Sequence, residues 1–244
     1  MEHEILITRL FNDNLAGVGN AILAAVGQHA HNADRPWTNW ITMQILVALV
    51  IMIVFAMLKP RLSMENPGKM QHIMEAIYGF IRGEAESNVH HAHHYVAFFG
   101  SIFIFVLFSN LIGIIPGLES PTMFPYVPCG LAIASFLYFN FMGIKAQGVG
   151  RYIAHFAGPV WWMSPLMFPI EVISTMARPL SLTIRLYANM YAGEQVTLLF
   201  LGLTYFVMPA VFMGLHVFVS FLQAYVFMLM TMLYVGGAVA HEEH

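Results

Sequence analysis

Long stretches without a charged residue restrict this chain to a membrane fold more strongly than any other feature. Several of these stretches exceed eighteen residues, which is enough for a helix to cross the hydrocarbon core of a bilayer. Only 9% of the 244 residues are charged, whereas about 25% is usual for a soluble domain. A soluble fold of this length would lack the charged surface that it needs. We therefore predict an all-α polytopic membrane protein.

The apolar stretches predict about five membrane-embedded helices and one amphipathic surface helix. The surface helix is expected at about 64–86, where Met70, Ile73 and Ile77 recur at the spacing of one helical face. The expected spans are 40–58, 95–115, 129–144, 166–205 and 210–240. Residues 166–205 would rise about 60 Å as a helix, against about 30 Å of hydrocarbon. This span must therefore tilt steeply, break near Pro179 or extend beyond the bilayer, and we interpret it as half of a long tilted C-terminal hairpin.

The basic residues predict how these spans are oriented. Six of the ten lie in the loops after the first and third spans, namely Lys59, Arg61, Lys69, Arg82, Lys145 and Arg151. Cytoplasmic loops carry an excess of Lys and Arg, so we expect the N-terminus outside and the C-terminus in the cytoplasm. Residues 1–36 are interpreted as an outer N-terminal arm with an interfacial helix near 5–27, and residues 37–244 as a single membrane domain.

The remaining composition gives no sign of a nucleic-acid partner, a cofactor or a metal. The formal net charge of −3 is too small to indicate a polyanionic partner, and no GxxxxGK[ST] phosphate loop occurs. Four histidines occupy the five positions from His90 to His94. His90 and His94 have the i, i+4 spacing of a helical metal pair, but no third ligand is evident. We interpret the cluster as a solvated group beside the membrane.

One apolar stretch, residues 168–195, contains charged residues where they are costly. A charge at membrane depth costs several kcal/mol, which makes such residues candidates for function. At about 100° per residue, one face of a helix collects five of the polar residues. These are Glu171, Arg178, Ser181, Arg185 and Asn189. Glu194 lies about 180° from Arg185 on the same arithmetic, so we expect it to face a different neighbour.

Arg185 is a permanent cation that needs a counter-ion. Glu171 lies fourteen residues away, about 21 Å along a helix, and no acidic residue lies three or four positions from Arg185. We therefore predict that the counter-ion belongs to another chain. A fixed cation lowers the pKa of a carboxyl group that passes it and repels protons from a continuous aqueous path. Arg185 could thus make a passing carboxyl group release its proton, and it could separate two proton access routes.

Glu194 and His216 are titratable groups that the hairpin would bring together. Membrane proton relays are built from Asp, Glu and His side chains. His216, Ser220 and Gln223 share one helical face. A structural alternative is that Glu194 lies at the interface and that His216 and Gln223 only form hydrogen bonds between helices.

Three motifs resemble one known family, subunit a of the F-type ATP synthase, which is the membrane stator half of its proton channel. They are RPLSLTIRLYANMYAGE at 178–194, His216 with Gln223 seven residues later, and SNLIGIIPG at 109–117. The resemblance covers the chain from the first span to the end. It implies a long tilted hairpin that lies against a ring of c subunits, in a bacterial plasma membrane. The implied partners are the c-ring, the peripheral-stalk b subunits, the rest of the synthase and the lipid bilayer, with no cofactor.

The resemblance also implies roles for individual residues in two offset half-channels. Arg185 would face the c-ring carboxylates, with Asn189 and Gln223 close to it. Glu194 and His216 would take up protons from outside, and rotation of the ring would be the coupled output. Three further polar residues complete the set, namely Glu171 in the inner half-channel, Ser181 on the same stripe as Glu171, and Asn110 in the outer half-channel.

Two other classes of protein are compatible with a polar stripe in a membrane helix. A free-standing proton-coupled transporter could use Arg185 to bind an anionic substrate, but it should hold its own counter-ion. A membrane scaffold without a transport role would have no need of Arg185. The missing counter-ion favours a subunit that works against a partner chain.

Overall fold

The computed structural model describes most of the chain, and every regular element in this part is helical. The described residues are 4–25, 34–63, 68–89, 92–115, 117–150, 152, 164–203 and 207–239. Their α-helices are α1 (Leu6–Ala25), α2 (Asn39–Leu58), α3 (Lys69–Asn88), α4 (Val96–Ile112), α5 (Tyr126–Gln147), α7 (Ser164–Leu203) and α8 (Val207–Val239). Three short 3-10 helices are η1 (Lys59–Arg61), η2 (Ala92–His94) and η3 (Pro121–Met123). The prediction of an all-α polytopic membrane protein is confirmed.

The apolar stretches fold into helices that can cross a bilayer. In the described part of the chain, Asn39–Leu58, Tyr126–Gln147 and Ala210–Val239 are long and apolar enough to do so, and Val96–Ile112 is a shorter apolar helix. Helices suit this setting because each one satisfies its own backbone hydrogen bonds. Small polar side chains in these helices also form hydrogen bonds within their own helix, since the Thr42 and Ser101 hydroxyls donate to carbonyls one turn earlier.

The bounds of two helices differ from the predicted spans for local reasons. α4 ends at Ile112 rather than 115, because the amides of Ile114 and Ile115 donate to carbonyls three residues back and tighten the chain into turns. α5 begins at Tyr126 rather than 129. Its first turn contains Pro128, and proline is tolerated there because the amides of a first turn have no partner within the helix.

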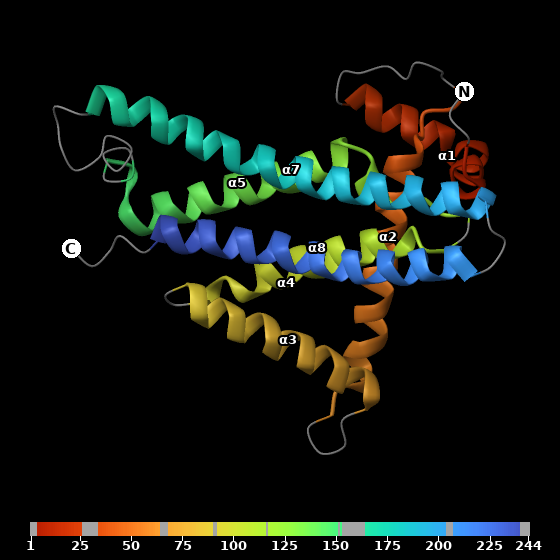
Figure 1. Cartoon of the computed structure of the whole chain (residues 1–244), viewed down its shortest axis with the longest axis horizontal. Coiled ribbons are helices and arrows are strands. Elements are labelled where there is room, and N and C mark those ends of the chain that lie inside the picture. The colour runs from red at the N-terminus through yellow and green to blue at the C-terminus, as the bar shows by residue number, and fades with distance from the viewer. Residues whose placement is uncertain are drawn as a thin grey trace.

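α7 is a single helix of 40 residues, although it contains Pro169 and Pro179. The sequence left three alternatives for this span, namely a steep tilt, a break near Pro179 or extension beyond the bilayer, and the break does not occur. The Pro179 carbonyl accepts a hydrogen bond from the Thr183 hydroxyl at 2.8 Å. α7 and α8 lie side by side along the long axis of the molecule, whereas α2 runs across their direction (Figure 1).

The main core lies where α8 packs against α4, α5 and α7. Its fully buried members are large apolar side chains such as Phe99, Phe103, Phe139, Leu186, Met190, Phe227 and Met228. On α7 the buried residues Leu182, Leu186 and Met190 recur every four positions, so one stripe of this helix packs inward. The remaining surface of α7 is therefore left for the membrane or for partners.

α1 and α3 lie at the periphery. α1 is tied to the chain before α2, because Asn12 donates to the Trp37 carbonyl at 3.2 Å and accepts from the Trp37 amide at 2.9 Å. α3 buries Ile81 and Ala85 but leaves Met70 and Ile73 exposed. Its placement along a membrane surface stays a prediction.

Candidate functional site

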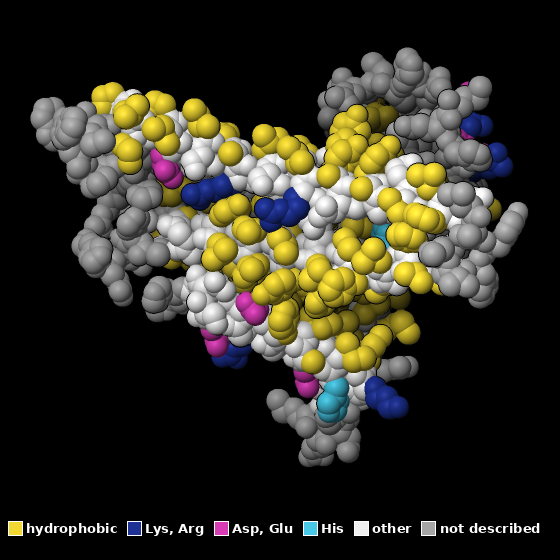
Figure 2. All heavy atoms as spheres, viewed as in Figure 1, with side chains coloured by type: hydrophobic (Ala, Val, Ile, Leu, Met, Phe, Trp, Pro, Cys, Tyr) yellow, Lys and Arg dark blue, Asp and Glu magenta, His cyan; other side chains and the backbone are white. Residues whose placement is uncertain are grey.

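The polar residues of α7 lie along the edge of its packed face. Ser181 and Asn189 are exposed and Arg185 is partly exposed, whereas Leu182 and Leu186 are buried beside them. Figure 2 shows that Lys or Arg side chains and an acidic side chain interrupt a largely hydrophobic surface over α7 and α8. Charged groups thus border an apolar surface that the chain itself leaves open.

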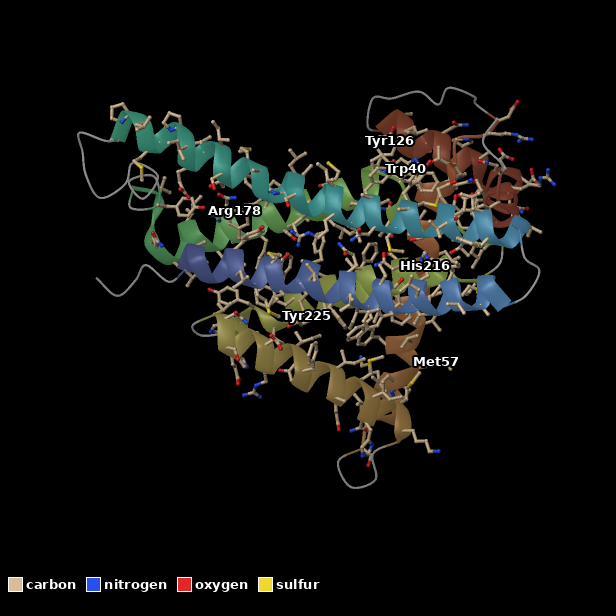
Figure 3. All side chains as sticks on the ribbon, viewed as in Figure 1. Trp40, Met57, Tyr126, Arg178, His216 and Tyr225 are labelled. Carbon is tan, nitrogen blue, oxygen red and sulfur yellow. The ribbon has the colours of Figure 1, made fainter. Side chains whose placement is uncertain are left out.

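Arg178 finds partners inside the chain. Its Nη2 lies 3.9 Å from Oε1 of Glu171, and its guanidinium lies 5.1 Å from the ring centre of Tyr234 and 6.0 Å from that of Phe139. A small cavity of about 180 Å³, the Arg178 pocket, is lined by these residues and Tyr152. Arg178 points from α7 into the bundle (Figure 3). Glu171 therefore pairs with Arg178, which the sequence analysis did not foresee.

Arg185 contrasts with Arg178, although it lies only two helical turns further along α7. In the described part of the chain its guanidinium forms no ion pair and no hydrogen bond. Nearby apolar side chains on the same helix are open to the outside, since Leu180 is 59% and Ile184 is 54% exposed. That the counter-ion of Arg185 belongs to another chain stays a prediction.

Asn189 and Gln223 join α7 to α8 one turn beyond Arg185. The Asn189 side-chain amide donates to Oε1 of Gln223 at 2.9 Å. Gln223 is almost fully buried, at 5% exposure. The hydrogen bond therefore fixes the register of the two long helices beside Arg185.

A larger cavity of about 500 Å³ lies between α7 and α8, and we name it the His216 cavity. Its lining includes Asn189, Gly193, Thr197, His216 and Gln223. The His216 ring packs on the backbone of Gly193, where an added Cβ would lie 3.2 Å from Nδ1. Figure 3 shows His216 between the two helices.

Glu194 and His216 both carry buried polar atoms at this place. Oε2 of Glu194 and Nε2 of His216 have no hydrogen-bond partner among the described residues. Buried polar groups in folded proteins are nearly always hydrogen-bonded, to the protein or to water. The hairpin thus brings His216 against Gly193, the residue before Glu194, and His216 lines a cavity large enough for several waters.

Asn110 belongs to a fully buried group that we name the hydroxyl cluster, formed by Ser109, Asn110, Ser120, Thr122 and Ser220. The Asn110 amide donates to the Ser220 carbonyl at 3.4 Å, and its Oδ1 accepts from the Thr122 hydroxyl at 2.6 Å. Ser120 lies 2.7 Å from Thr122 between hydroxyl oxygens and donates to the Ser109 carbonyl at 2.8 Å. Sequence reasoning missed Ser120 and Thr122, and the Ser-Pro-Thr turn that opens η3 was the available signal.

The described members of the histidine cluster, His93 and His94, take no part in this site. His93 and His94 are exposed in η2, with ring centres 5.5 Å apart, and His90 lies outside the described residues. The described residues contain no group of three His, Cys, Asp or Glu side chains that could hold a metal ion.

Comparison with known proteins gives one consistent result. Residues 40–236 match the family model described as ATP synthase A chain. ATP synthase subunit a of Solibacter usitatus (strain Ellin6076) is 64% identical over 234 residues, which cover 96% of this chain and 100% of that protein. ATP synthase subunit a of Koribacter versatilis (strain Ellin345) is 41% identical over 242 residues, covering 99% of both chains.

Proposed function

This chain belongs to the ATP synthase A chain family, subunit a of the F-type enzyme, and from that premise we propose how its residues move protons. As a member of this family it is a multi-pass stator subunit of the proton channel and assembles with the rest of the F-type complex. We propose two offset half-channels against a ring of c subunits, with Arg185 between them. The orientation has the N-terminus outside and the C-terminus in the cytoplasm.

The observation that carries this proposal is the environment of Arg185. It is a permanent cation, partly exposed, unpaired within the described residues, and bordered by the exposed apolar side chains of Leu180 and Ile184. A carboxylate on an apolar partner surface would neutralise the guanidinium of Arg185 and cover the apolar side chains of Leu180 and Ile184. A ring of c subunits presents such carboxylates one after another as it rotates.

The outer half-channel uses Glu194 and His216. A proton from outside reaches these side chains through the His216 cavity and passes to a ring carboxylate, which becomes neutral. The neutral carboxylic acid can then face lipid, because the cost of a charge in hydrocarbon is removed. Asn189 and Gln223 hold the hairpin in register beside this transfer.

The inner half-channel uses the other end of α7. A ring carboxyl that returns to Arg185 ionises, because the nearby cation favours the charged form. The released proton leaves along the polar stripe past Ser181 to Glu171, whose carboxylate lies in the Arg178 pocket. Arg185 blocks direct passage between the two half-channels because it repels protons.

The free-standing transporter is not favoured by any feature of the described residues. Such a protein would have to neutralise Arg185 itself before substrate binds. The only acidic side chain that pairs with an arginine of α7 in the described residues is Glu171, and it pairs with Arg178.

The central test replaces Arg185 in the whole synthase. In membrane vesicles, Arg185→Ala should abolish proton-driven ATP synthesis and allow a passive proton leak, because the barrier between the half-channels is gone. Lys145→Ala is the matched control, since Lys145 is an exposed cation on α5 away from the stripe. Unchanged ATP synthesis in Arg185→Ala would reject the proposed function.

The outer pair is tested by passive proton flux through the reconstituted membrane sector. Glu194→Gln and His216→Ala should each slow the flux about a hundredfold or more, since a positioned acid or base contributes about 10²–10⁴-fold. Co-purification of the c-ring should be unchanged. Wild-type flux in both variants would show that the pair only joins helices.

A further inference from the structure

The ion pair between Arg178 and Glu171 is looser than the other arginine pairs in the part of the chain that the structure describes. Its nitrogen and oxygen atoms are 3.9 Å apart, whereas the two other arginine–glutamate pairs of this part close to 2.6 and 2.7 Å. A charge-assisted hydrogen bond needs about 2.7–2.9 Å. The Arg178 guanidinium is therefore near enough to offset the charge of Glu171, but it forms no hydrogen bond with that carboxylate.

Two aromatic rings from other helices hold the Arg178 guanidinium in this position. Its central carbon lies 5.1 Å from the ring centre of Tyr234 on α8 and 6.0 Å from that of Phe139 on α5, within reach of a cation–π interaction. The two rings also contact one another, with centres 5.9 Å apart, and Phe139 is only 2% exposed. We name the pair of rings the aromatic seat. Because both rings belong to the packed bundle, α5 and α8 fix where the guanidinium lies.

Tyr152 completes the wall of the Arg178 pocket, and its polar atom is already engaged elsewhere. Its hydroxyl donates to Oδ1 of Asn140 on α5 at 2.8 Å. Its ring occupies the space beside Gly143, where an added Cβ would lie 2.6 Å from Cε2 of the ring. The Tyr152 ring therefore borders the pocket while its hydroxyl is bonded to α5.

Few groups in the Arg178 pocket could set how tightly Glu171 binds a proton. The lining holds one other charged side chain, Arg178, and the titratable hydroxyls of Tyr152 and Tyr234. The rest of the lining carries no titratable side chain and consists of Phe139, Thr175, Leu233, Gly237 and Ala238. A nearby cation favours the charged form of a carboxyl group, and a hydrogen bond to the carboxylate favours it further. The distance between Arg178 and Glu171 therefore controls how readily Glu171 binds a proton.

We propose that the aromatic seat holds the Arg178 guanidinium off the Glu171 carboxylate, so that Glu171 stays able to bind and release protons in the inner half-channel. Phe139 and Tyr234 are thus positioning residues that act through Arg178. In the transfer, the Glu171 carboxylate takes up a proton that was released beside Arg185, gives it to water on the cytoplasmic side and returns to its charged form. This inference rests on the proposed function, and it adds a device that sets the proton affinity of one exit group.

The first experiment removes one ring of the aromatic seat. Passive proton flux through the reconstituted membrane sector is measured against the pH at the cytoplasmic face, with protons entering from that face. In Tyr234→Leu the guanidinium is free to close on Glu171, so protonation of Glu171 needs a more acid solution. We expect the pH of half-maximal flux to fall by about one unit, the low end of the effect of an adjacent arginine. Flux at acid pH should stay near that of the wild type.

Two further variants show whether the shift is specific to the seat. Tyr234→Phe keeps the ring and should keep the wild-type midpoint. Tyr138→Leu is the matched control, because it removes a half-buried tyrosine of α5 that stacks on Phe98 and does not line the pocket. An unmoved midpoint in Tyr234→Leu, an equal shift in Tyr138→Leu, or a loss of flux at every pH without a shift would overturn the inference.

A double variant tests whether the seat acts through the guanidinium. Arg178→Gln leaves no cation for the rings to hold, so adding Tyr234→Leu to it should not move the midpoint further. A shift of the same size in this background would overturn the inference, because the ring would then act without Arg178.

Fluorinated phenylalanines at position 234 test the same contact without a change in packing. Fluorine atoms weaken the negative face of the ring that attracts a cation and alter its size little, so the complex should assemble as in the wild type. The midpoint should move toward acid pH step by step as fluorine atoms are added. A midpoint that does not depend on fluorination would overturn the inference.

Glu171→Gln separates this inference from the proposed function. Slow flux in Glu171→Gln together with a wild-type midpoint in Tyr234→Leu would overturn the inference and leave the proposed function standing. Unchanged ATP synthesis in Arg185→Ala would reject the proposed function, and the inference would fall with it.

Discussion

The two arginines of α7 show how the same residue type on one helical face serves two purposes. Arg178 is enclosed by its own chain, with Glu171 at 3.9 Å and the Tyr234 ring at 5.1 Å. Arg185 has no such partner among the described residues. An arginine that is already neutralised can only hold structure or tune its neighbour. An arginine without an internal counter-ion is free to act on a carboxylate that another subunit brings to it.

The difference arises from spacing as well as from packing. Glu171 and Arg178 are seven residues apart, about 10.5 Å along the helix axis, and two long side chains can span this distance. Arg185 is too far from Glu171 for the same contact. The tertiary structure adds Phe139 from α5 and Tyr234 from α8 to Arg178, so the bundle gives aromatic partners to Arg178, although both arginines are partly exposed.

The largest expected effect comes from giving Arg185 the environment of Arg178. Ser181 is exposed and lies four residues before Arg185, so Ser181→Glu should form an i, i+4 pair with it. About 1.4 kcal/mol of added attraction would slow a step that needs free Arg185 about tenfold. We therefore expect ATP synthesis in vesicles to fall at least about tenfold, although Arg185 is still present. Ser181→Gln is the control, and equal activity in the two variants would contradict the comparison.

A smaller effect is expected from removing the enclosed arginine. Exposed or half-exposed ion pairs contribute about 0–1 kcal/mol, so Arg178→Gln should reduce ATP synthesis no more than about fivefold. The complex should still assemble, because Glu171 remains partly exposed and can be hydrated. Initial rates of ATP synthesis would be compared with those of Arg185→Gln. A complete loss in Arg178→Gln would show that the two arginines are functionally equivalent.

The smallest effect is expected at the hydrogen bond that sets the register beside Arg185. A hydrogen bond contributes about 0.5–1.5 kcal/mol net, so Asn189→Ala should lower ATP synthesis only about threefold and slightly reduce the melting temperature of the complex. Ser101→Ala is the control, because its hydroxyl donates to the Ala97 carbonyl of its own helix, α4. A loss as large as that of Arg185→Ala would mean that Asn189 contacts the moving carboxylate directly.

Much of the fold could be predicted because membrane helices are determined by local sequence. A bilayer requires each span to satisfy its own backbone, so uncharged length alone indicated α2, α4, α5 and α8. The predictions were least accurate at helix ends, where α5 begins three residues earlier than predicted and tight turns shorten α4. The division into an outer arm and one membrane domain stays a prediction.

The candidate site was predictable only in part. The cost of a charge in the membrane pointed to Arg185, and the motif pointed to Glu194 and His216. The pairing of Arg178 with Glu171 and the hydroxyl cluster were not foreseen. The pair lies within α7 at a spacing of seven residues. The rings around Arg178 and the hydroxyl cluster, in contrast, depend on residues from separate helices, such as Tyr234 of α8 and Thr122 of η3, whose approach no spacing within one helix reveals.

The sequence by itself determined that this chain is a helical membrane protein with an unmatched arginine on a polar helical face. These features are local, because they follow from hydropathy, from helical periodicity and from the fixed charge of a guanidinium. Only the tertiary structure decided which arginine finds aromatic partners on other helices and which polar side chains meet in the hydroxyl cluster. Those outcomes depend on side-chain contacts between helices that are far apart in the chain, and such contacts exist only once the bundle has packed.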